Sequence, residues 1–201
     1  MSEVKARPPV SDAALDVLFR KARSYNGFEP GTISEATLRA LYDIAKEGPT
    51  TANSQPQRIL FLNSPAAKNR LDGMMSKTNL AKTLAAPCVA ILAYDLRFFE
   101  HLDRMYHVKG ARGWYETTPP EIYTTALRNA SLQGAYFIMA ARALGLECGP
   151  ISGFNNAGVD AEFFPDGRIK SNFICALGHG DPSGVWPRNP RLSFEEACRI
   201  L

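Results

Sequence analysis

The sequence lacks the features that mark several common classes of protein. It has no Cys-x-x-Cys pair, and its four cysteines stand far apart, at Cys88, Cys148, Cys175 and Cys198. Its three histidines have no partner at ligand spacing, so we expect reduced thiols and no metal site. No apolar run reaches the roughly 20 residues of a membrane helix, and residues 1–10 lack the apolar stretch of a signal peptide. These absences favour a cytoplasmic protein.

An excess of charge of one sign is also missing. Lys and Arg total 23 against 20 Asp and Glu, and this formal net charge of +3 is too small to indicate nucleic-acid binding. Hydrophobic residues make up 45% and charged residues 21% of the 201 residues, which excludes disordered, collagenous and coiled-coil classes. A chain of this length buries roughly 70% of its unfolded surface. We therefore expect a single domain over residues 1–201, with about residues 1–10 flexible.

The hydrophobic pattern predicts helices and short strands in irregular alternation. Apolar residues recur at helical spacing in 11–24, 34–47 and 120–144. The pattern predicts a strand at 58–62, and short apolar runs predict buried strands at 88–94 and 173–177. Because few βαβ units are present, the pattern favours an α+β fold. The second half of the longest helix is apolar almost all round, so we expect it to be central or at a subunit interface.

The composition changes after residue 180. Three Xaa-Pro steps, Asp181-Pro182, Trp186-Pro187 and Asn189-Pro190, interrupt regular structure and predict an extended arm over about 181–201. Near the end of this arm, Ser193 and Glu196 have the spacing of a capping box for a short last helix.

Common catalytic signatures are absent as well. The sequence contains no Gly-x-Ser-x-Gly elbow and no P-loop. Gly178-His179-Gly180 follows a predicted strand, but its spacing to Gly184 does not fit a dinucleotide loop. With no nucleophile-and-base motif, a bound cofactor that carries the reaction is the more economical interpretation.

Three short polar segments separate the apolar elements, at 23–28, 48–56 and 149–154. Each by itself is typical of an ordinary loop. Together they offer a guanidinium group, hydroxyls, carboxamides and glycine-flanked backbone N–H groups. Flavin mononucleotide (FMN) needs such groups, because its phosphate takes arginine and hydroxyl contacts and its pyrimidine edge takes amides.

Six segments, in this order, make the sequence resemble the nitroreductase family of FMN-dependent oxidoreductases over nearly the whole chain. They are Arg-Ser-x-x-x-Phe at 23–28, Pro-Thr-Thr-Ala-Asn-Ser-Gln-Pro at 49–56, Asn79 ahead of Ala86-Pro87, Ala-Leu-Gly-Leu at 143–146, Pro-Ile-Ser-Gly-Phe at 150–154 and Arg188-x-x-Arg191-Leu192. More narrowly, 152–154, 170–172 and 190–198 resemble the subgroup that contains the malonic semialdehyde reductase of the pyrimidine-utilisation pathway.

The resemblance implies an intertwined homodimer of α+β subunits, each with a mostly antiparallel or mixed sheet flanked by helices, and FMN at the subunit interface. It implies that NADH or NADPH reduces FMN, which then passes the hydride through N5 to a small oxidised substrate. That substrate would be malonic semialdehyde, reduced to 3-hydroxypropionate. The alternatives are a general nitro, quinone or enone reductase, a flavin-binding redox module of low turnover, and a structural dimer without cofactor. We expect no indispensable catalytic acid or base.

The same resemblance implies the cofactor contacts residue by residue. The phosphate would be held by Arg23, Ser24, Arg188 and Arg191. The dimethylbenzene or ribityl side would be lined by Pro49, Thr50 and Asn53. The pyrimidine edge and N5 would face Asn79, Ser152 and Gly153. The substrate would be covered by Arg112 and Trp114, with a nicotinamide phosphate as an alternative ligand of Arg112. Ordinary structural roles remain open: solubilising charges for the late arginines, a turn for Asn53, a helix cap for Asn79, and an aromatic core plug for 110–120.

Two positions depart from the family pattern. Many members carry Lys or Arg where this sequence has Asn26, near the flavin N1–C2=O edge. A cation there favours the reduced flavin, so Asn26 implies a lower reduction potential unless Arg58 or another group substitutes. Many members also carry an acidic residue where Ser152 stands. Both departures weigh against nitro-group reduction without weighing against flavin binding.

Overall fold

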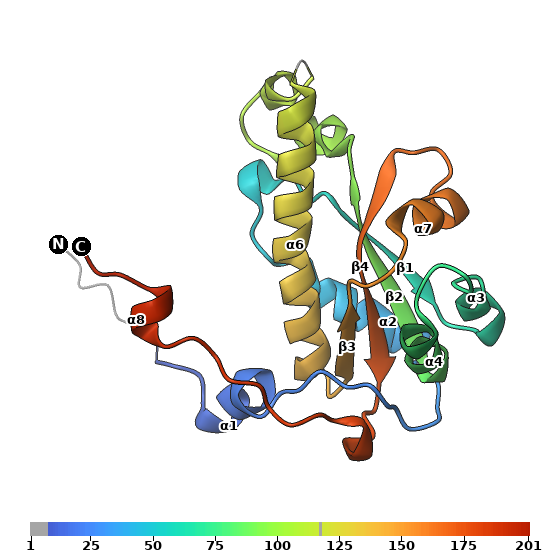
Figure 1. The fold of residues 1–201 in the computed structure, drawn as a ribbon. Helices are drawn as coiled ribbons and strands as arrows, with labels where there is room; N and C mark the ends of the chain where they lie inside the picture. Colours follow the sequence, from blue (N-terminus) through green and yellow to red (C-terminus); the bar gives the residue numbers. More distant parts are fainter. Residues whose placement is uncertain (1–7, 117) are drawn as a thin grey trace.

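The computed structural model describes residues 8–116 and 118–201. Four strands form one sheet in the order β1-β2-β4-β3, and each neighbouring pair is antiparallel (Figure 1). The strands are β1 (Gln57–Leu62), β2 (Cys88–Asp95), β3 (Glu147–Ile151) and β4 (Ile169–Gly178). The α+β prediction is confirmed, and the sheet is antiparallel rather than mixed. The expected flexibility of about residues 1–10 falls mostly outside the described residues.

Helices cover both faces of the sheet. On one face lie α2 (Glu35–Ala45) and α6 (Pro119–Ala143), and on the other lie α3 (Pro65–Asn69), α4 (Lys77–Ala85) and α7 (Asn156–Phe163) (Figure 1). In the central strand β2, Ala90 and Leu92 pack toward α2 and α6, while Val89 and Ile91 pack toward the opposite layer. Because alternate residues of a strand point to opposite faces, a strand buried on both sides reads as a continuous apolar run.

The predicted helix starts follow ordinary capping chemistry. The Ser34 hydroxyl accepts a hydrogen bond from the N–H of Thr37 at the start of α2, and the Ser64 hydroxyl accepts from the N–H of Ala67 at the start of α3. Pro65 occupies the first turn of α3, where a missing N–H costs nothing. The sequence signals at these two helix starts are therefore confirmed.

The first predicted helix is shorter than the pattern indicated. It consists of α1 (Asp12–Leu15) and the π-helical turn η1 (Asp16–Arg20). Beyond it the chain pairs with the edge of the sheet, because the N–H of Tyr25 donates to the carbonyl of Cys148 at 2.9 Å. This tertiary hydrogen bond replaces the helical continuation expected up to Ser24.

A third group of packed residues lies beyond one end of the sheet, beside the first half of α6. It contains η3 (Phe98–His101), α5 (Leu102–Met105) and η4 (Ala111–Trp114). Tyr115 is buried there and meets the ring of Phe98 edge to face at 4.9 Å. The core-plug interpretation of the 110–120 segment therefore holds for Tyr115, whereas Trp114 is exposed.

The long helix α6 is not covered on every side within one chain. Phe137 and Ala140 are buried against the sheet, but Leu132 is 49% and Tyr136 is 44% exposed. These two apolar side chains lie in neighbouring turns of α6, so within one chain this part of the helix faces solvent. No helix among the described residues is long and apolar enough to cross a membrane.

The last twenty residues contain two short helical turns, η5 (Pro182–Gly184) and α8 (Phe194–Ala197). Figure 1 shows this segment running alongside α1 and away from the sheet. The capping box of Ser193 and Glu196 is present in both directions, as predicted. Apolar side chains at the end of the segment, including Ile200 and Leu201, are exposed.

Candidate functional site

The segment after the first helix is fixed against the outer strand β3. Besides the hydrogen bond between Tyr25 and Cys148, the two backbones approach very closely at Gly149. A Cβ atom on Gly149 would lie 2.5 Å from the Tyr25 carbonyl oxygen. Only glycine permits this approach, and it places Arg23, Ser24 and Asn26 at the edge of the sheet.

Arg23 and Arg188 lie together where this segment crosses the C-terminal one. Arg23 donates to the carbonyl of Trp186, and Arg188 donates to the carbonyls of Arg20 and Ala22 at 2.8 and 3.0 Å. Both guanidinium groups are thus held by neutral backbone oxygens. Within residues 8–116 and 118–201, neither forms an ion pair with a carboxylate.

Arg191 does not join this pair within one chain. Its guanidinium donates to the carbonyls of Asn189 and Pro190, at 3.0 and 3.1 Å, in its own exposed segment. The structure therefore brings together three of the four residues expected at the phosphate: Arg23, the neighbouring Ser24, and Arg188. The role of Arg191 stays a prediction.

The expected pyrimidine-edge residues also converge, around α4. Asn79 donates from its side-chain amide to the carbonyl of Gly153 at 2.9 Å, next to Ser152. Asn26 donates to the carbonyl of Gly184 at 3.2 Å. The helix-cap alternative for Asn79 is wrong, because the N-cap of α4 is Ser76, whose hydroxyl accepts from the N–H of Asn79.

Lys82 is a residue of this cluster that our sequence analysis did not single out. Its Nζ donates to Oδ1 of Asn26 at 3.2 Å, and burial lowers the pKa of its ammonium group. No carboxylate in the described part of the chain lies within ion-pair distance of it. The available signal was its spacing of three residues from Asn79, which puts both side chains on one face of a helix.

Lys82 also identifies the cation that lies near Asn26, where many family members are expected to carry a basic residue. Arg58 is held at 2.6 Å by the buried Asp95, at the junction of β1 and β2, whereas the side chain that contacts Asn26 is Lys82. The positive charge near Asn26 comes instead from α4. A cation therefore stands beside Asn26 even though that position itself is neutral.

A second cluster forms on the loop between α2 and β1. This loop carries Pro49, Thr50 and the short helical turn η2 (Thr51–Asn53). Three of its residues that are not glycine adopt the left-handed conformation: Ala52, Asn53 and Gln55, with φ of 51°, 50° and 40°. Such backbone persists only where its surroundings hold it, and here the buried Asn129 of α6 accepts from the N–H of Thr51 at 2.8 Å.

The two expected substrate residues lie on the helical segments next to this loop. Asn53 donates to the carbonyl of Met105 at 2.8 Å, which ties the loop to α5. Trp114 lies 6.1 Å from Tyr106, ring centre to ring centre, and Arg112 pairs with Glu116 at 2.6 Å. Asn53 is thus both a turn residue and a contact between segments.

The two clusters occupy different faces of the sheet. The first includes Asn79 and Lys82 of α4, whereas the second is anchored on α6 through Asn129 (Figure 1). Within one chain, the pieces of the expected flavin site therefore form two groups rather than one.

Other chemistries find no support in the described residues. No group of three or more His, Cys, Asp or Glu that could hold a metal ion occurs there. Cys88, Cys148 and Cys175 are buried, and burial raises the pKa of the Cys88 thiol to about 12. A thiolate nucleophile at Cys88 is therefore excluded near neutral pH.

Comparisons with known proteins identify the family of this chain. A model of the family described as "Nitroreductase family" matches residues 19–179. A Caulobacter sp. (strain K31) protein named "Putative NADH dehydrogenase/NAD(P)H nitroreductase" is 54% identical over 190 residues, which cover 94% of this chain and 97% of that protein.

Two solved structures show the same fold. The first is a nitroreductase from Exiguobacterium sibiricum in complex with FMN, with a TM-score of 0.86 and 18% identity over 98% of this chain and all of that one. The second is CLA-ER, an enone reductase of gut-bacterial fatty acid metabolism, with a TM-score of 0.79 and 17% identity over 96% of this chain and all of that one.

Proposed function

This chain belongs to the nitroreductase family, and from that premise we propose that it is an FMN-dependent oxidoreductase using NADH or NADPH. The similar Caulobacter protein carries the name of an NAD(P)H nitroreductase, and a structure of the same fold binds FMN. When bound, FMN would supply the hydride-transfer chemistry between the nicotinamide and an oxidised substrate.

The observation that carries this proposal is the pairing of Arg23 with Arg188 at the crossing of two segments, with Lys82 beside Asn26 further along the same edge. Arg23, Lys82 and Arg188 lie along one edge of the subunit, and none forms an ion pair with a carboxylate of the described chain. A group of cations held only by neutral oxygens suits an anionic ligand, because binding the anion does not require an internal ion pair to break. The phosphate of FMN is such an anion.

The residue roles follow the positions of these cations. We assign the phosphate to Arg23, Ser24 and Arg188, with Arg191 joining from the C-terminal segment. The amide of Asn79 and the ammonium of Lys82 would bind the pyrimidine edge. Ser152 and Gly153, which are exposed between β3 and α7, would present backbone groups to the reacting side of the ring.

The same proposal requires a homodimer. Pro49, Thr50 and Asn53 lie on the other face of the sheet, so they would reach the flavin bound by the partner subunit rather than by their own. The exposed apolar surface of α6 around Leu132 and Tyr136 would be covered in this assembly. Burying such a surface stabilises association by roughly 25 cal/mol per Å² before the entropic cost of association is subtracted.

For the substrate we propose a small oxidised acceptor. Reduction of malonic semialdehyde to 3-hydroxypropionate rests on the subgroup resemblance of 152–154, 170–172 and 190–198. Reduction of a conjugated nitro, quinone or enone compound is the second candidate, because flavins reduce conjugated acceptors more readily than simple aldehydes. The name of the Caulobacter relative and the enone reductase of the same fold favour this second candidate.

A single purified preparation tests the proposal. We expect a visible flavin spectrum that bleaches rapidly under anaerobic conditions with excess NADH or NADPH. Addition of malonic semialdehyde or of nitrofurazone should then restore the spectrum and identify the acceptor class. Slow bleaching with both nicotinamides would instead favour the low-turnover redox module. A colourless preparation that gains no absorbance from added FMN would contradict flavin binding altogether.

A further inference from the structure

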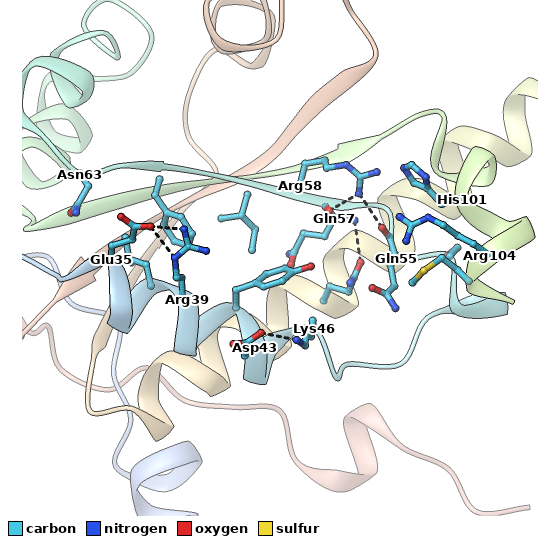
Figure 2. A pocket seen from close by; sticks show the side chains of 17 residues that line it. Glu35, Arg39, Asp43, Lys46, Gln55, Gln57, Arg58, Asn63, His101 and Arg104 are labelled. Carbon is cyan, nitrogen blue, oxygen red and sulfur yellow. Dashed lines mark hydrogen bonds and ion pairs between the residues drawn. The ribbon is translucent and has the colours of Figure 1, made fainter.

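A cavity of about 1050 Å³ lies between α2 and β1 and reaches α5. Its two ends differ in charge. In the described part of the chain, the acidic residues that line it are Glu35 and Asp43, and both already pair, with Arg39 and Lys46. Figure 2 shows that the opposite end is formed by Arg58, His101 and Arg104. We call this opposite end, together with Ser54, the arginine end.

In the described chain, the arginine end joins an arginine without a paired carboxylate to one that is already paired. Arg58 lies 2.6 Å from the buried Asp95, and Arg168 bridges Asp95 and Glu100 at 2.8 and 3.1 Å. Arg104 is exposed and forms no ion pair within residues 8–116 and 118–201. Burial, together with the charges of Arg58 and Arg104, lowers the pKa of His101, which favours the neutral imidazole, a hydrogen-bonding group.

An unsatisfied hydroxyl lies in the wall at the same end. Ser54 is 2% exposed, and its Oγ has no hydrogen-bond partner in the described chain. A buried hydroxyl without a partner costs free energy, which a ligand oxygen that approaches it recovers. The backbone here is also constrained, because the next residue, Gln55, has a φ of 40°.

The arginine end adjoins the loop that we assign to the flavin. Asn53 donates to the carbonyl of Met105, and its side-chain oxygen accepts from Gln55 at 2.8 Å. Both Met105 and Gln55 line the cavity. The cavity therefore begins where the proposed flavin loop ends, and a molecule that lies against this loop can extend toward Arg104.

From these observations we propose that the arginine end binds the carboxylate of a small organic acid, and that the protein reduces acceptors bearing such a carboxylate. The carboxylate would accept hydrogen bonds from Arg104, Ser54 and the remaining N–H groups of Arg58. This inference names the substrate class of the proposed oxidoreductase and rests on that proposed function. Hydrogen bonds between ionised partners are strong enough for selection among otherwise identical acceptors.

Calorimetric titration of the FMN-loaded protein with benzoate and with benzamide tests the subsite without turnover. These probes have the same ring and nearly the same size, but only benzoate is charged. We expect benzoate to bind at least tenfold more tightly, and Arg104→Gln to remove most of this preference. Arg39→Gln, at the other end of the same cavity, is the matched control and should keep it. Equal binding of the two probes, or a preference that survives in Arg104→Gln, would overturn the proposal.

Turnover separates this inference from the proposed function. The ratio of kcat/KM for 4-nitrobenzoate to that for 4-nitrobenzamide should fall about tenfold in Arg104→Gln. Failure of NADH and NADPH to reduce the bound flavin would remove the oxidoreductase, while the calorimetric preference would still decide the subsite. An unchanged ratio in a protein that turns over both compounds would remove the substrate class alone.

The carboxylates of the C-terminal segment are a second candidate ligand of the arginine end, in place of the carboxylate of a small organic acid. Glu195 and Glu196 are exposed on α8, and in a dimer they would compete for the arginine end if α8 of one subunit reached it. In that case the wild type would show no preference for benzoate, and the double variant Glu195→Gln/Glu196→Gln would gain one. That result would assign the arginine end to the partner subunit and overturn the proposal.

Discussion

Lys82 on α4 donates from Nζ to Oδ1 of Asn26 across 3.2 Å, and so joins two segments that lie 56 residues apart in the sequence. The family resemblance implies a cation at the position of Asn26 in many members. In this chain a cation reaches the same place from α4, and its ammonium group is hydrogen-bonded to the amide of Asn26. We therefore propose that Lys82 supplies the charge beside the pyrimidine edge.

Replacing this lysine should make the bound flavin harder to reduce. In Lys82→Met the positive charge is lost, and with it the stabilisation of the electron-rich reduced cofactor. We expect the midpoint potential of bound FMN to fall by about 30 mV or more, which corresponds to about 1.4 kcal/mol for a two-electron couple. Anaerobic titration against redox dyes of known potential measures the change.

Lys77→Met is the matched control, because Lys77 begins the same helix and is exposed. Its potential should equal that of the wild type. A Lys82→Met protein that retains both FMN and the wild-type potential would show that Lys82 does not face the flavin, and the assignment of the pyrimidine edge to α4 would then be wrong.

The arginines at the crossing of the two terminal segments should dominate retention of the cofactor. In Arg188→Gln we expect FMN to bind at least tenfold more weakly, because a hydrogen bond to a charged group contributes roughly 1.5–3 kcal/mol. Arg191→Gln should weaken binding to a similar extent if the C-terminal segment closes over the phosphate. Equilibrium dialysis or quenching of flavin fluorescence measures both affinities.

Arg39→Gln serves as a control of the same charge change, since Arg39 is exposed and already paired with Glu35. Thermal unfolding of the cofactor-free proteins should be nearly the same for all three variants. Loss of FMN in Arg188→Gln but not in Arg191→Gln would limit the phosphate site to the pair that one subunit already forms, Arg23 and Arg188. Unchanged affinity in both variants would contradict the phosphate assignment.

Much of the fold follows from local signals in the sequence. The continuous apolar run that becomes β2, the caps at Ser34 and Ser64, and the capping box at Ser193 depend on residues close to one another in the chain. The predicted end of the first helix, at Ser24, was wrong, because the backbone of Tyr25 pairs with Cys148, more than 120 residues away. No local pattern reports a partner so distant.

The residues of the candidate site also divide into those that local motifs predict and those that only the folded chain brings together. Arg23, Asn79 and the Ser152-Gly153 turn could be selected from the sequence, because each belongs to a short motif in a fixed order. Lys82 was missed because a lysine on an ordinary helix resembles a solvated surface charge. The arginine end was missed because Ser54, Arg58 and Arg104 come from a loop, a strand and a helix that only the folded chain brings together.

The buried carboxylate of Asp95 should control stability at acidic pH. Burial alone would raise its pKa, but hydrogen bonds from Arg168 and from the N–H of Arg97, with the charge of Arg58, lower the pKa below the usual value. The native state therefore binds fewer protons at Asp95 than the unfolded chain does. Its stabilisation is present in full above the unfolded pKa near 4 and is lost as the pH falls through the lower native value.

Asp95→Asn removes this contribution. We expect the free energy of unfolding at pH 7 to fall by roughly 3 kcal/mol, because Asp95 is 1% exposed and holds two arginines. The difference from the wild type should shrink below pH 4, because the unfolded chain takes up a proton at this position before the native state does. Urea unfolding at fixed protein concentration measures both effects, with the exposed Asp43→Asn as control. A difference that does not change between pH 7 and pH 3.5 would contradict the pKa direction.

Disrupting the exposed apolar surface of α6 should dissociate the proposed dimer and, in the same variant, release FMN. In Leu132→Glu a charge replaces an apolar side chain that is 49% exposed in the single chain, so the fold of one subunit has room for it. In a dimer the same carboxylate would be buried without a partner, at a cost of several kcal/mol.

Sedimentation velocity should show a dimer for the wild type and a monomer for the variant. The monomer should also lose FMN, because each site needs the loop around Asn53 from its partner. Leu201→Glu, at the exposed end of the chain and away from α6, provides a control for the added charge. A wild type that sediments as a monomer while retaining FMN would contradict the shared site, because one subunit would then bind the flavin without that loop.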